Sequence, residues 1–272
     1  MDTPNDYGKG ELTLITEDQV QFYHDNGYLL VKGVYNTEEV RRFQESVETF
    51  LKRAAASKFD RSHAWQGDYL PPEQLKKLVL KGFHDVQYHD AQFTQMITQL
   101  KLVGIFAKLI GDNVQLHHTK MMVKPPEKGA AFPMHQDYPY FPHTKHSMML
   151  ASIHLDRTNE ENGCLHVIPG SHKQGPLPHV GSYYLNHKEY PIERGTPCIA
   201  EAGDVLFFNY LTIHGSPINR SDRTRRNILV QVRDPEDLPT NDKHVNWGQG
   251  MMLHGINPLF RNYNYEGKLA EV

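Results

Sequence analysis

The stretch Val205-Leu206-Phe207-Phe208-Asn209-Tyr210-Leu211-Thr212-Ile213 is an almost unbroken apolar run that ends directly before His214 and Gly215. A short apolar run bounded by turn residues is typical of a buried β-strand. Further runs of this kind alternate with Gly, Pro and Asn at 114–124, 147–155, 164–168, 196–200, 204–209 and 227–233. This alternation predicts a mainly β fold with an antiparallel jelly-roll core.

The residues before this core show helical signals. Thr16 and Gln19 have the spacing of a capping box, and Asn36-Thr37 favours the start of a second helix. The predicted elements are a helix at 16–26, a short strand at 28–34, a helix from 36 to about 52 and a helix near 92–110. Residues 1–15 are expected to be an irregular lead-in, and 54–95 give no clear assignment.

Size and composition suit one large β-rich domain. The chain has 272 residues, of which 39% are hydrophobic and 22% are charged. These values allow a sizeable core. We expect a single domain over 1–272, with a helical N-terminal part at about 16–110, the jelly-roll core at about 114–235 and a C-terminal extension at 236–272.

The charge and the hydropathy of the chain restrict the classes of partner that we expect. The formal net charge of −3 disfavours a nucleic-acid binder, which normally has a basic excess. No apolar stretch has the length needed to cross a bilayer, so the expected partner is a small molecule rather than a membrane. The oligomeric state stays open.

Cellular location is inferred from three weak signals. The two cysteines, Cys164 and Cys198, give no disulfide framework, which fits a reducing compartment. The first residues show no secretory leader, and the final Ala270-Glu271-Val272 is not a peroxisomal address. The cytoplasm is therefore the expected location.

Two His-x-Asp triplets are candidates for metal binding, His135-Gln136-Asp137 and His154-Leu155-Asp156. In extended backbone, residues i and i+2 face the same side, so each triplet presents two ligands together. The chain has 17 histidines, so such a triplet also arises by chance. A Pro/Gly-rich loop before the first triplet and an aromatic stretch after it favour that one. The second lies inside a strand-like run, where an interior histidine is the simpler interpretation.

A third ligand must come from a distant strand, and His214 stands at the end of the 205–213 run. Two imidazoles and one carboxylate hold one face of an Fe(II) ion and leave three positions open for a cosubstrate and O2. Zinc is the alternative metal, although the usual catalytic zinc trio has a different, helix-borne spacing.

Four arginines, at 220, 223, 225 and 226, crowd the segment before the 227–233 run. A solvated basic turn explains Arg220 and Arg223. Either Arg225 or Arg226 can point into a barrel from the start of the following strand. A guanidinium binds a carboxylate through two parallel hydrogen bonds, which suits a dicarboxylic cosubstrate such as 2-oxoglutarate.

Taken in order along the chain, these motifs resemble the phytanoyl-CoA dioxygenase family. The resemblance covers roughly 15–235 and is strongest between 118 and 233. The segments that carry it are Lys124-Pro125-Pro126, His135-Gln136-Asp137, Tyr140-Phe141-Pro142, Asn162-Gly163-Cys164-Leu165, Ile168-Pro169-Gly170-Ser171-His172-Lys173, Gly203-Asp204 and His214-Gly215-Ser216.

The resemblance implies a double-stranded β-helix core with N-terminal and flanking α-helices. It also implies that His135, Asp137 and His214 are the catalytic Fe(II) ligands. Use of 2-oxoglutarate and O2 follows, with release of succinate and CO2 and hydroxylation of a substrate carbon. The aspartate in the triplet argues against a halogenase, where the resemblance predicts Ala or Gly.

For the cosubstrate, the resemblance places Arg225 on the distal carboxylate of 2-oxoglutarate, with Ser216 assisting. Lys120 falls where the family supplies another residue of this pocket, and neighbouring His118 is a further candidate. The chain departs from the family at Lys120, which replaces an apolar residue, and at Ser152, which replaces a tryptophan. The loop before His135 is also shorter.

These departures disfavour a fatty acyl-CoA. Lys120, His118, His143 and Arg233 indicate a polar or anionic pocket, which favours a small polar or anionic metabolite, for example an acid, an amino acid or a phosphonate. The candidate substrate-contact residues are Tyr138, Tyr140, His143, His154 and Arg233. An acyl-CoA 2-hydroxylase, a non-catalytic jelly-roll binding protein and a nucleic-acid-modifying oxygenase are the alternatives, of which the acidic balance disfavours the last.

Overall fold

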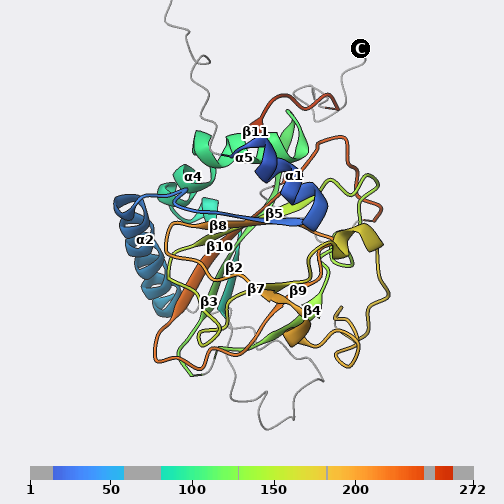
Figure 1. The fold of residues 1–272 in the computed structure, drawn as a ribbon. Helices are drawn as coiled ribbons and strands as arrows, with labels where there is room; N and C mark the ends of the chain where they lie inside the picture. The colour runs from blue at the N-terminus through green and yellow to red at the C-terminus, as the bar shows by residue number, and fades with distance from the viewer. Residues whose placement is uncertain (1–14, 58–80, 128, 182, 242–248, 260–272) are drawn as a thin grey trace, which may run out of the picture.

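The computed structural model describes residues 15–57, 81–127, 129–181, 183–241 and 249–259. Its strands form two antiparallel sheets (Figure 1). The seven-stranded sheet has the order β1-β8-β5-β10-β3-β11, with β2 also paired to β3, and the four-stranded sheet has the order β4-β9-β6-β7. The expected mainly β, jelly-roll fold is confirmed. The lead-in before 15 and most of 54–95 and of the C-terminal extension lie outside the described residues.

The strand bounds show which expected runs form strands. In the larger sheet these are β1 (Tyr28–Val31), β2 (Lys81–His84), β3 (Val114–Lys124), β5 (Met149–His154), β8 (Val205–Asn209), β10 (Arg225–Arg233) and β11 (Met252–His254). In the smaller sheet they are β4 (Phe132–His135), β6 (His166–Val167), β7 (Thr196–Pro197) and β9 (His214–Ser216). Strands β2, β4, β9 and β11 are additional to the expected runs.

The apolar run after Asp204 supplies one strand to each sheet. β8 pairs with β1 and β5 in the larger sheet. The chain then turns at Asn209, whose side-chain and backbone oxygens accept from the backbone N–H groups of Leu211 and Thr212. β9 follows at once and pairs with β4 and β6 in the smaller sheet. This crossing brings His214 to the inner side of the core.

Two helix starts follow the predicted caps. α1 (Glu17–Asn26) begins after Thr16 and α2 (Thr37–Ala56) begins after Asn36, each with a complete capping box. α2 ends four residues later than expected. Short 3-10 helices occur at η1 (Val86–Tyr88), η2 (Ser171–Gln174) and η3 (Ile192–Arg194).

The single helix expected near 92–110 is wrong, because the segment forms α4 (Ala91–Ile97) and α5 (Leu100–Ile110), bent by 42° at the break. Thr98 closes α4 on the carbonyl of Thr94 with both its N–H and its hydroxyl, and Gln99 is extended. Threonine favours helix interiors less than Ala or Leu does, which fits a break at this point. Within the described residues, no single helix meets the length and hydropathy needed to span a membrane, but this bent pair does when its helices are counted together.

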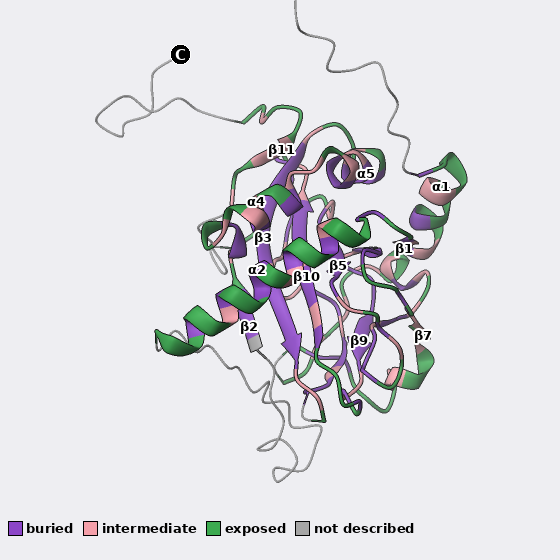
Figure 2. Cartoon of the chain, turned by 90° about the vertical axis from the view of Figure 1, so that its left-hand side faces the viewer, coloured by how far each residue is buried: buried purple, intermediate pink, exposed green. Residues whose placement is uncertain are grey.

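The larger sheet has two different faces. α2 lies across its outer face, with a buried side toward β3 and β10 and an exposed side toward solvent (Figure 2). Val40, Phe43 and Val47 of α2 belong to the same apolar cluster as Met121 and Ile228 of the sheet. On the inner face, part of the surface packs against the smaller sheet, and the rest lines a cavity.

A β-bulge in β3 changes which side chains reach the inner face. The pairing with β10 shifts between Gln231, which faces His118, and Val232, which faces Leu116. The extra residue is His117. As a result, the consecutive rings of His117 and His118 both lie 5.0 Å from the ring of Phe141, between centroids. A regular strand would send them to opposite faces.

Candidate metal and cosubstrate site

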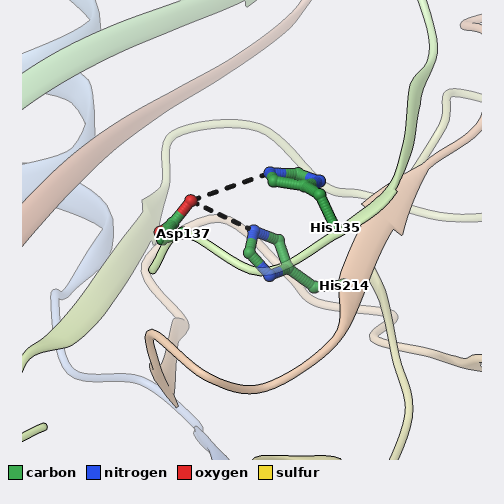
Figure 3. A group of neighbouring side chains, drawn as sticks. All are labelled: His135, Asp137 and His214. Atoms are coloured by element: carbon green, nitrogen blue, oxygen red, sulfur yellow. Dashed lines mark ion pairs between the residues drawn. The ribbon is translucent and has the colours of Figure 1, made fainter. Parts of the chain in front are cut away.

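The two ligands of the first His-x-Asp triplet and the distant His214 converge between the sheets, as the sequence predicted. One ligand atom from each of His135, Asp137 and His214 lies within 4.8 Å of the others, and we refer to these residues as the triad (Figure 3). The Nε2 atoms of His135 and His214 lie 3.7 Å and 3.8 Å from Asp137 Oδ1. In the described residues this is the one such His/Cys/Asp/Glu group, and the second triplet contributes none of its members.

Local hydrogen bonds orient both imidazoles. His135 Nδ1 donates to the carbonyl of Pro133 at 2.8 Å, and His214 Nδ1 donates to that of Thr212 at 2.9 Å. Each Nε2 therefore carries the lone pair and points at the centre of the triad. Burial lowers the pKa of His135 to about 3 and that of His214 to about 4. Neutral imidazoles with backbone-bonded Nδ1 are the form that binds a metal ion.

The carboxylate is held from two sides. The backbone N–H of Asp137 donates to the carbonyl of Tyr210 at 2.9 Å, and its Oδ2 lies 3.4 Å from Gln231 Nε2. Burial raises the pKa of Asp137. A buried carboxylate beside two neutral imidazoles lacks a full counter-charge, so this donor set fits a divalent cation such as Fe(II).

The middle residue of the triplet, Gln136, anchors a loop rather than the metal. Its Nε2 donates to the carbonyls of Gly175 and Leu211, and its Oε1 accepts from the N–H of Leu177. The side chain is fully buried. Because Gln136 points away from the triad, the extended backbone on either side of it presents His135 and Asp137 together.

A cavity of about 330 Å³ connects the triad with the start of β10. Arg225 lines this cavity, while Arg226 faces outward and pairs with Asp156 at 2.7 Å. Arg225 is buried and donates to the carbonyl of Gly163. Its buried Nε has no hydrogen-bond partner in the described part of the chain. Burial lowers the Arg225 pKa to about 10.

Lys124 lies beside this guanidinium as the cross-strand partner of Arg225. Its Nζ donates to Ser216 Oγ and to the carbonyl of Pro217, each at 2.7 Å. Burial, and then the charge of Arg225, hold the pKa of Lys124 well below its usual range. Within the described residues, neither cation forms an ion pair with a carboxylate. Two buried cations without an anionic partner fit the distal carboxylate of a dicarboxylic acid.

The remaining predicted residues separate into two groups. Ser216, Lys120, His118 and Tyr140 line the cavity with the triad and Arg225. Tyr138, His143, His154 and Arg233 are not among its lining residues.

Those four side chains have other contacts. Tyr138 packs against Tyr210 and His146, and Arg233 donates to the carbonyls of Asp234, Pro235 and Asp237. His143 bonds to the carbonyl of Phe141, and buried His154 lies against the carbonyl of Asp204. Tyr138 and His143 were predicted because they follow the metal triplet closely in the sequence, but their side chains contact other elements instead of the cavity.

The cavity lining includes residues that were not among the predicted ones, among them Gln231, Gly82 and His84. Lys124 was not predicted either, and it lies beside the cavity as the cross-strand partner of Arg225. Lys124 carried a signal, because it lies four positions from Lys120 in the same strand and therefore on the same face. Gly82 and His84 carried none, since β2 has no clear strand pattern in the sequence. The position of Gln231 depends on its pairing with β3.

The phytanoyl-CoA dioxygenase (PhyH) family profile matches residues 23–227 of this chain. The chain belongs to the phytanoyl-CoA dioxygenase family. The predicted resemblance is thus confirmed. The family consists of Fe(II)- and 2-oxoglutarate-dependent dioxygenases, so the expected reaction class and cofactors are confirmed with it.

Relatives of this PhyH-family chain have different substrates in their names. It is 28% identical over 242 residues to the peroxisomal phytanoyl-CoA dioxygenase of Bos taurus, which covers 82% of this chain and 70% of that protein. It is 29% identical over 223 residues to a probable alpha-ketoglutarate-dependent hypophosphite dioxygenase of Stutzerimonas stutzeri, covering 78% and 77%.

The fold is also found in EctD from S. alaskensis, solved with 2-oxoglutarate and 5-hydroxyectoine. That structure aligns with a TM-score of 0.67 at 19% identity, over 85% of this chain and 80% of its own.

Proposed function

We propose that this PhyH-family dioxygenase hydroxylates a small polar metabolite, with His135, Asp137 and His214 as the ligands of Fe(II). The observation that carries the proposal is the cavity that joins the triad to Arg225, a buried cation beside which a second buried cation, Lys124, bonds to Ser216 of the cavity wall. Bound Fe(II) and 2-oxoglutarate supply the oxidising chemistry, in which O2 converts 2-oxoglutarate into succinate and CO2 while the substrate gains a hydroxyl group. The protein supplies position, charge and exclusion of water.

The distal carboxylate of 2-oxoglutarate is assigned to Arg225, Lys124 and Ser216. Arg225 offers Nε and Lys124 offers its ammonium, and Ser216 already accepts from Lys124. In this low-dielectric setting charge-assisted hydrogen bonds are stronger than neutral ones. Leu150, Leu165 and Phe208 line the same cavity and restrict water near the triad. Gln231 holds Asp137 at the angle at which its other oxygen meets both imidazoles.

A small substrate is favoured by the walls of the cavity. On the side away from Arg225 they are formed by Lys120, His84, His118 and Tyr140, together with Phe141. A long acyl chain requires an apolar tunnel, whereas this part of the wall carries an ammonium, two imidazoles and a phenol. The hypophosphite dioxygenase relative supports the same choice, since hypophosphite is a small anion.

Domain organisation and location are part of the proposal. β1 and β2 come from the N-terminal part and β11 from the C-terminal extension, and all three join the larger sheet, which favours one domain over 1–272. Cys164 and Cys198 are both free and buried, which fits a reducing compartment such as the cytoplasm. Some relatives are peroxisomal by name, so fractionation of cells that express the full chain tests the location.

The test of the function is a metabolite screen. Purified protein with Fe(II), 2-oxoglutarate and O2 is assayed for succinate, first alone and then with pools of small acids, amino acids and phosphonates. We expect one pool to raise succinate formation and to yield a product heavier by one oxygen atom. A non-catalytic binding protein would form no succinate with any pool, including pools of acyl-CoA thioesters.

A further inference from the structure

A second cation, Lys120, lines the cavity at a distance from Arg225 and from Lys124 beside it. Lys120 and Lys124 lie four residues apart on β3, which corresponds to about 13 Å along the strand. In the pairing with β10, Lys120 faces Leu229, whereas Lys124 faces Arg225. One carboxylate held between Arg225 and Lys124 is therefore out of reach of Lys120.

The Lys120 side chain leans away from β10, toward β2 on the other side of β3. Its Cε lies 3.0 Å, and its Nζ 3.8 Å, from the point where a Cβ at Gly82 would stand. Lys120 makes no hydrogen bond or ion pair with any described residue, and it lines the cavity. The charge of the Asp137 carboxylate acts on Lys120, but no carboxylate lies within ion-pair distance of it in the described residues. Once Asp137 holds the metal ion, a partly buried ammonium of this kind suits an incoming anion.

Gly82 explains how Lys120 fits. It lies inside strand β2 with no positive φ, so the backbone conformation does not require glycine there. Glycine inside a strand often marks a close approach by another group. Here the approaching group is the Lys120 side chain, and a larger residue at 82 would force that side chain to move from its present position.

Two imidazoles extend the same wall. His84 is the β2 residue paired with Lys120, and its ring stacks on that of His118 with 5.7 Å between centroids. His118 is itself fixed by His117, because their Nδ1 atoms lie 2.8 Å apart across the bulge. Imidazole N–H groups and an ammonium together are suitable donors to the oxygens of a carboxylate or phosphonate.

We propose that Lys120, His84 and His118 form a subsite for the anionic group of the primary substrate, and that Gly82 determines specificity by leaving room for Lys120. The substrate class is a small molecule with a terminal carboxylate or phosphonate. This inference rests on the proposed function, because it takes the Arg225 end of the cavity for 2-oxoglutarate. It assigns the two ends of one cavity to two different anions.

The experiment measures binding by calorimetry, without O2, so that no turnover occurs. The Fe(II)-loaded wild type is titrated with 2-oxoglutarate, and then with methylphosphonate, propionate and the neutral analogue propionamide. Lys120→Met and Gly82→Val are compared with Lys52→Met, an exposed lysine on α2. Circular dichroism and thermal melting establish whether each variant is folded. If Gly82→Val does not fold, Lys120→Met alone tests the subsite.

We expect at least one of the two anions to bind the wild type, and Lys120→Met and Gly82→Val each to weaken it about tenfold or more. The Kd for 2-oxoglutarate should change less than about twofold, because its distal carboxylate lies at the other end. Methylphosphonate and propionate distinguish a tetrahedral from a planar anion. Propionamide should bind all variants alike.

Three results would overturn the subsite. The first is that the wild type binds neither anion. The second is that both variants bind the anions as tightly as the wild type does, and the third is that Lys120→Met weakens the binding of 2-oxoglutarate but not that of the anions. The last would assign Lys120 to the cosubstrate. All anion titrations are repeated without 2-oxoglutarate. If the wild type fails to bind 2-oxoglutarate, that result contradicts the proposed function, and these repeated titrations still test the subsite.

Discussion

His135 and His214 are cross-strand partners in the β4–β9 pair, and each ring bonds through Nδ1 to the carbonyl two residues before it. The two sites are built alike although 79 positions separate them in the sequence. This shared local geometry fixes both rings in one tautomer and leaves both Nε2 atoms directed at Asp137 Oδ1. The histidine half of the triad is therefore preorganised by backbone, before a metal binds.

Removing the carboxylate should abolish metal binding and with it product formation. Asp137→Ala leaves two neutral imidazoles and no anionic ligand, which lowers affinity for a hard divalent cation. Calorimetric titration with Fe(II) under nitrogen measures the loss, and the succinate assay measures activity. His154→Ala is the matched control from the second His-x-Asp triplet and should bind Fe(II) as the wild type does. If His154→Ala lost metal binding and Asp137→Ala kept it, the metal site would have to be assigned to the second triplet instead.

The sequence allowed the triad to be predicted because its signals are local. A His-x-Asp triplet presents both ligands wherever the backbone is extended, and the run before His214 identifies a buried strand end. The choice between Arg225 and Arg226 needed more than the sequence. Alternation makes one of them face inward, and only the pairing of Arg225 with Lys124 shows which one.

Other features depend on tertiary contacts that no local pattern encodes. β2 is a strand because β3 offers it an edge, so the role of Gly82 beside Lys120 is invisible in sequence. The bulge at His117 reverses the alternation expected for an 11-residue strand. The break at Thr98 divides a segment whose apolar spacing continues through it.

The cosubstrate assignment predicts that Arg225→Ala raises the Michaelis constant for 2-oxoglutarate by about ten- to a hundredfold or more. Losing charge-assisted hydrogen bonds costs about 1.5–3 kcal/mol, at roughly 1.4 kcal/mol per decade. Arg225→Lys should recover only part of the affinity, because an ammonium lacks the planar fork. Steady-state kinetics with 2-oxoglutarate as the varied component measure both variants.

Neighbouring arginines provide the controls for Arg225. Arg226 pairs with Asp156 and Glu48 on the outer face, and Arg223 is exposed. Arg226→Ala and Arg223→Ala should leave the Michaelis constant for 2-oxoglutarate nearly unchanged. A large increase in Arg226→Ala together with a normal value in Arg225→Ala would contradict the assignment.

Lys124→Met should separate cosubstrate binding from stability. Burying an ammonium costs several kcal/mol, whereas the lost bonds to Ser216 and Pro217 cost about 1–3 kcal/mol. Without 2-oxoglutarate, the melting temperature of the variant should therefore equal or exceed that of the wild type. The Kd for 2-oxoglutarate should rise about tenfold or more, since one of two cations is gone. A lower melting temperature with unchanged affinity would make Lys124 a structural residue only.

Stability should fall with acidification, in part through His154. This side chain is 2% exposed, and burial, followed by the nearby charge of Arg225, lowers its pKa to about 4. The unfolded chain has a histidine pKa near 6.5, so it binds the proton first as pH falls. The contribution is therefore complete above about pH 6.5 and is lost progressively toward pH 4. Between pH 7 and 5.5 this one group should lower the free energy of unfolding by about 1 kcal/mol.

Urea unfolding of the Fe(II)-loaded protein at pH 7 and 5.5 measures this effect, because metal binding keeps His135 and His214 unprotonated. His154→Asn is the matched variant: its amide nitrogen can replace Nδ1 against the carbonyl of Asp204, and it does not titrate. The variant should be less stable at pH 7 because it fills less of the core, yet it should lose about 1 kcal/mol less than the wild type on acidification. An identical loss in both proteins would show that His154 is not the group that takes up the proton.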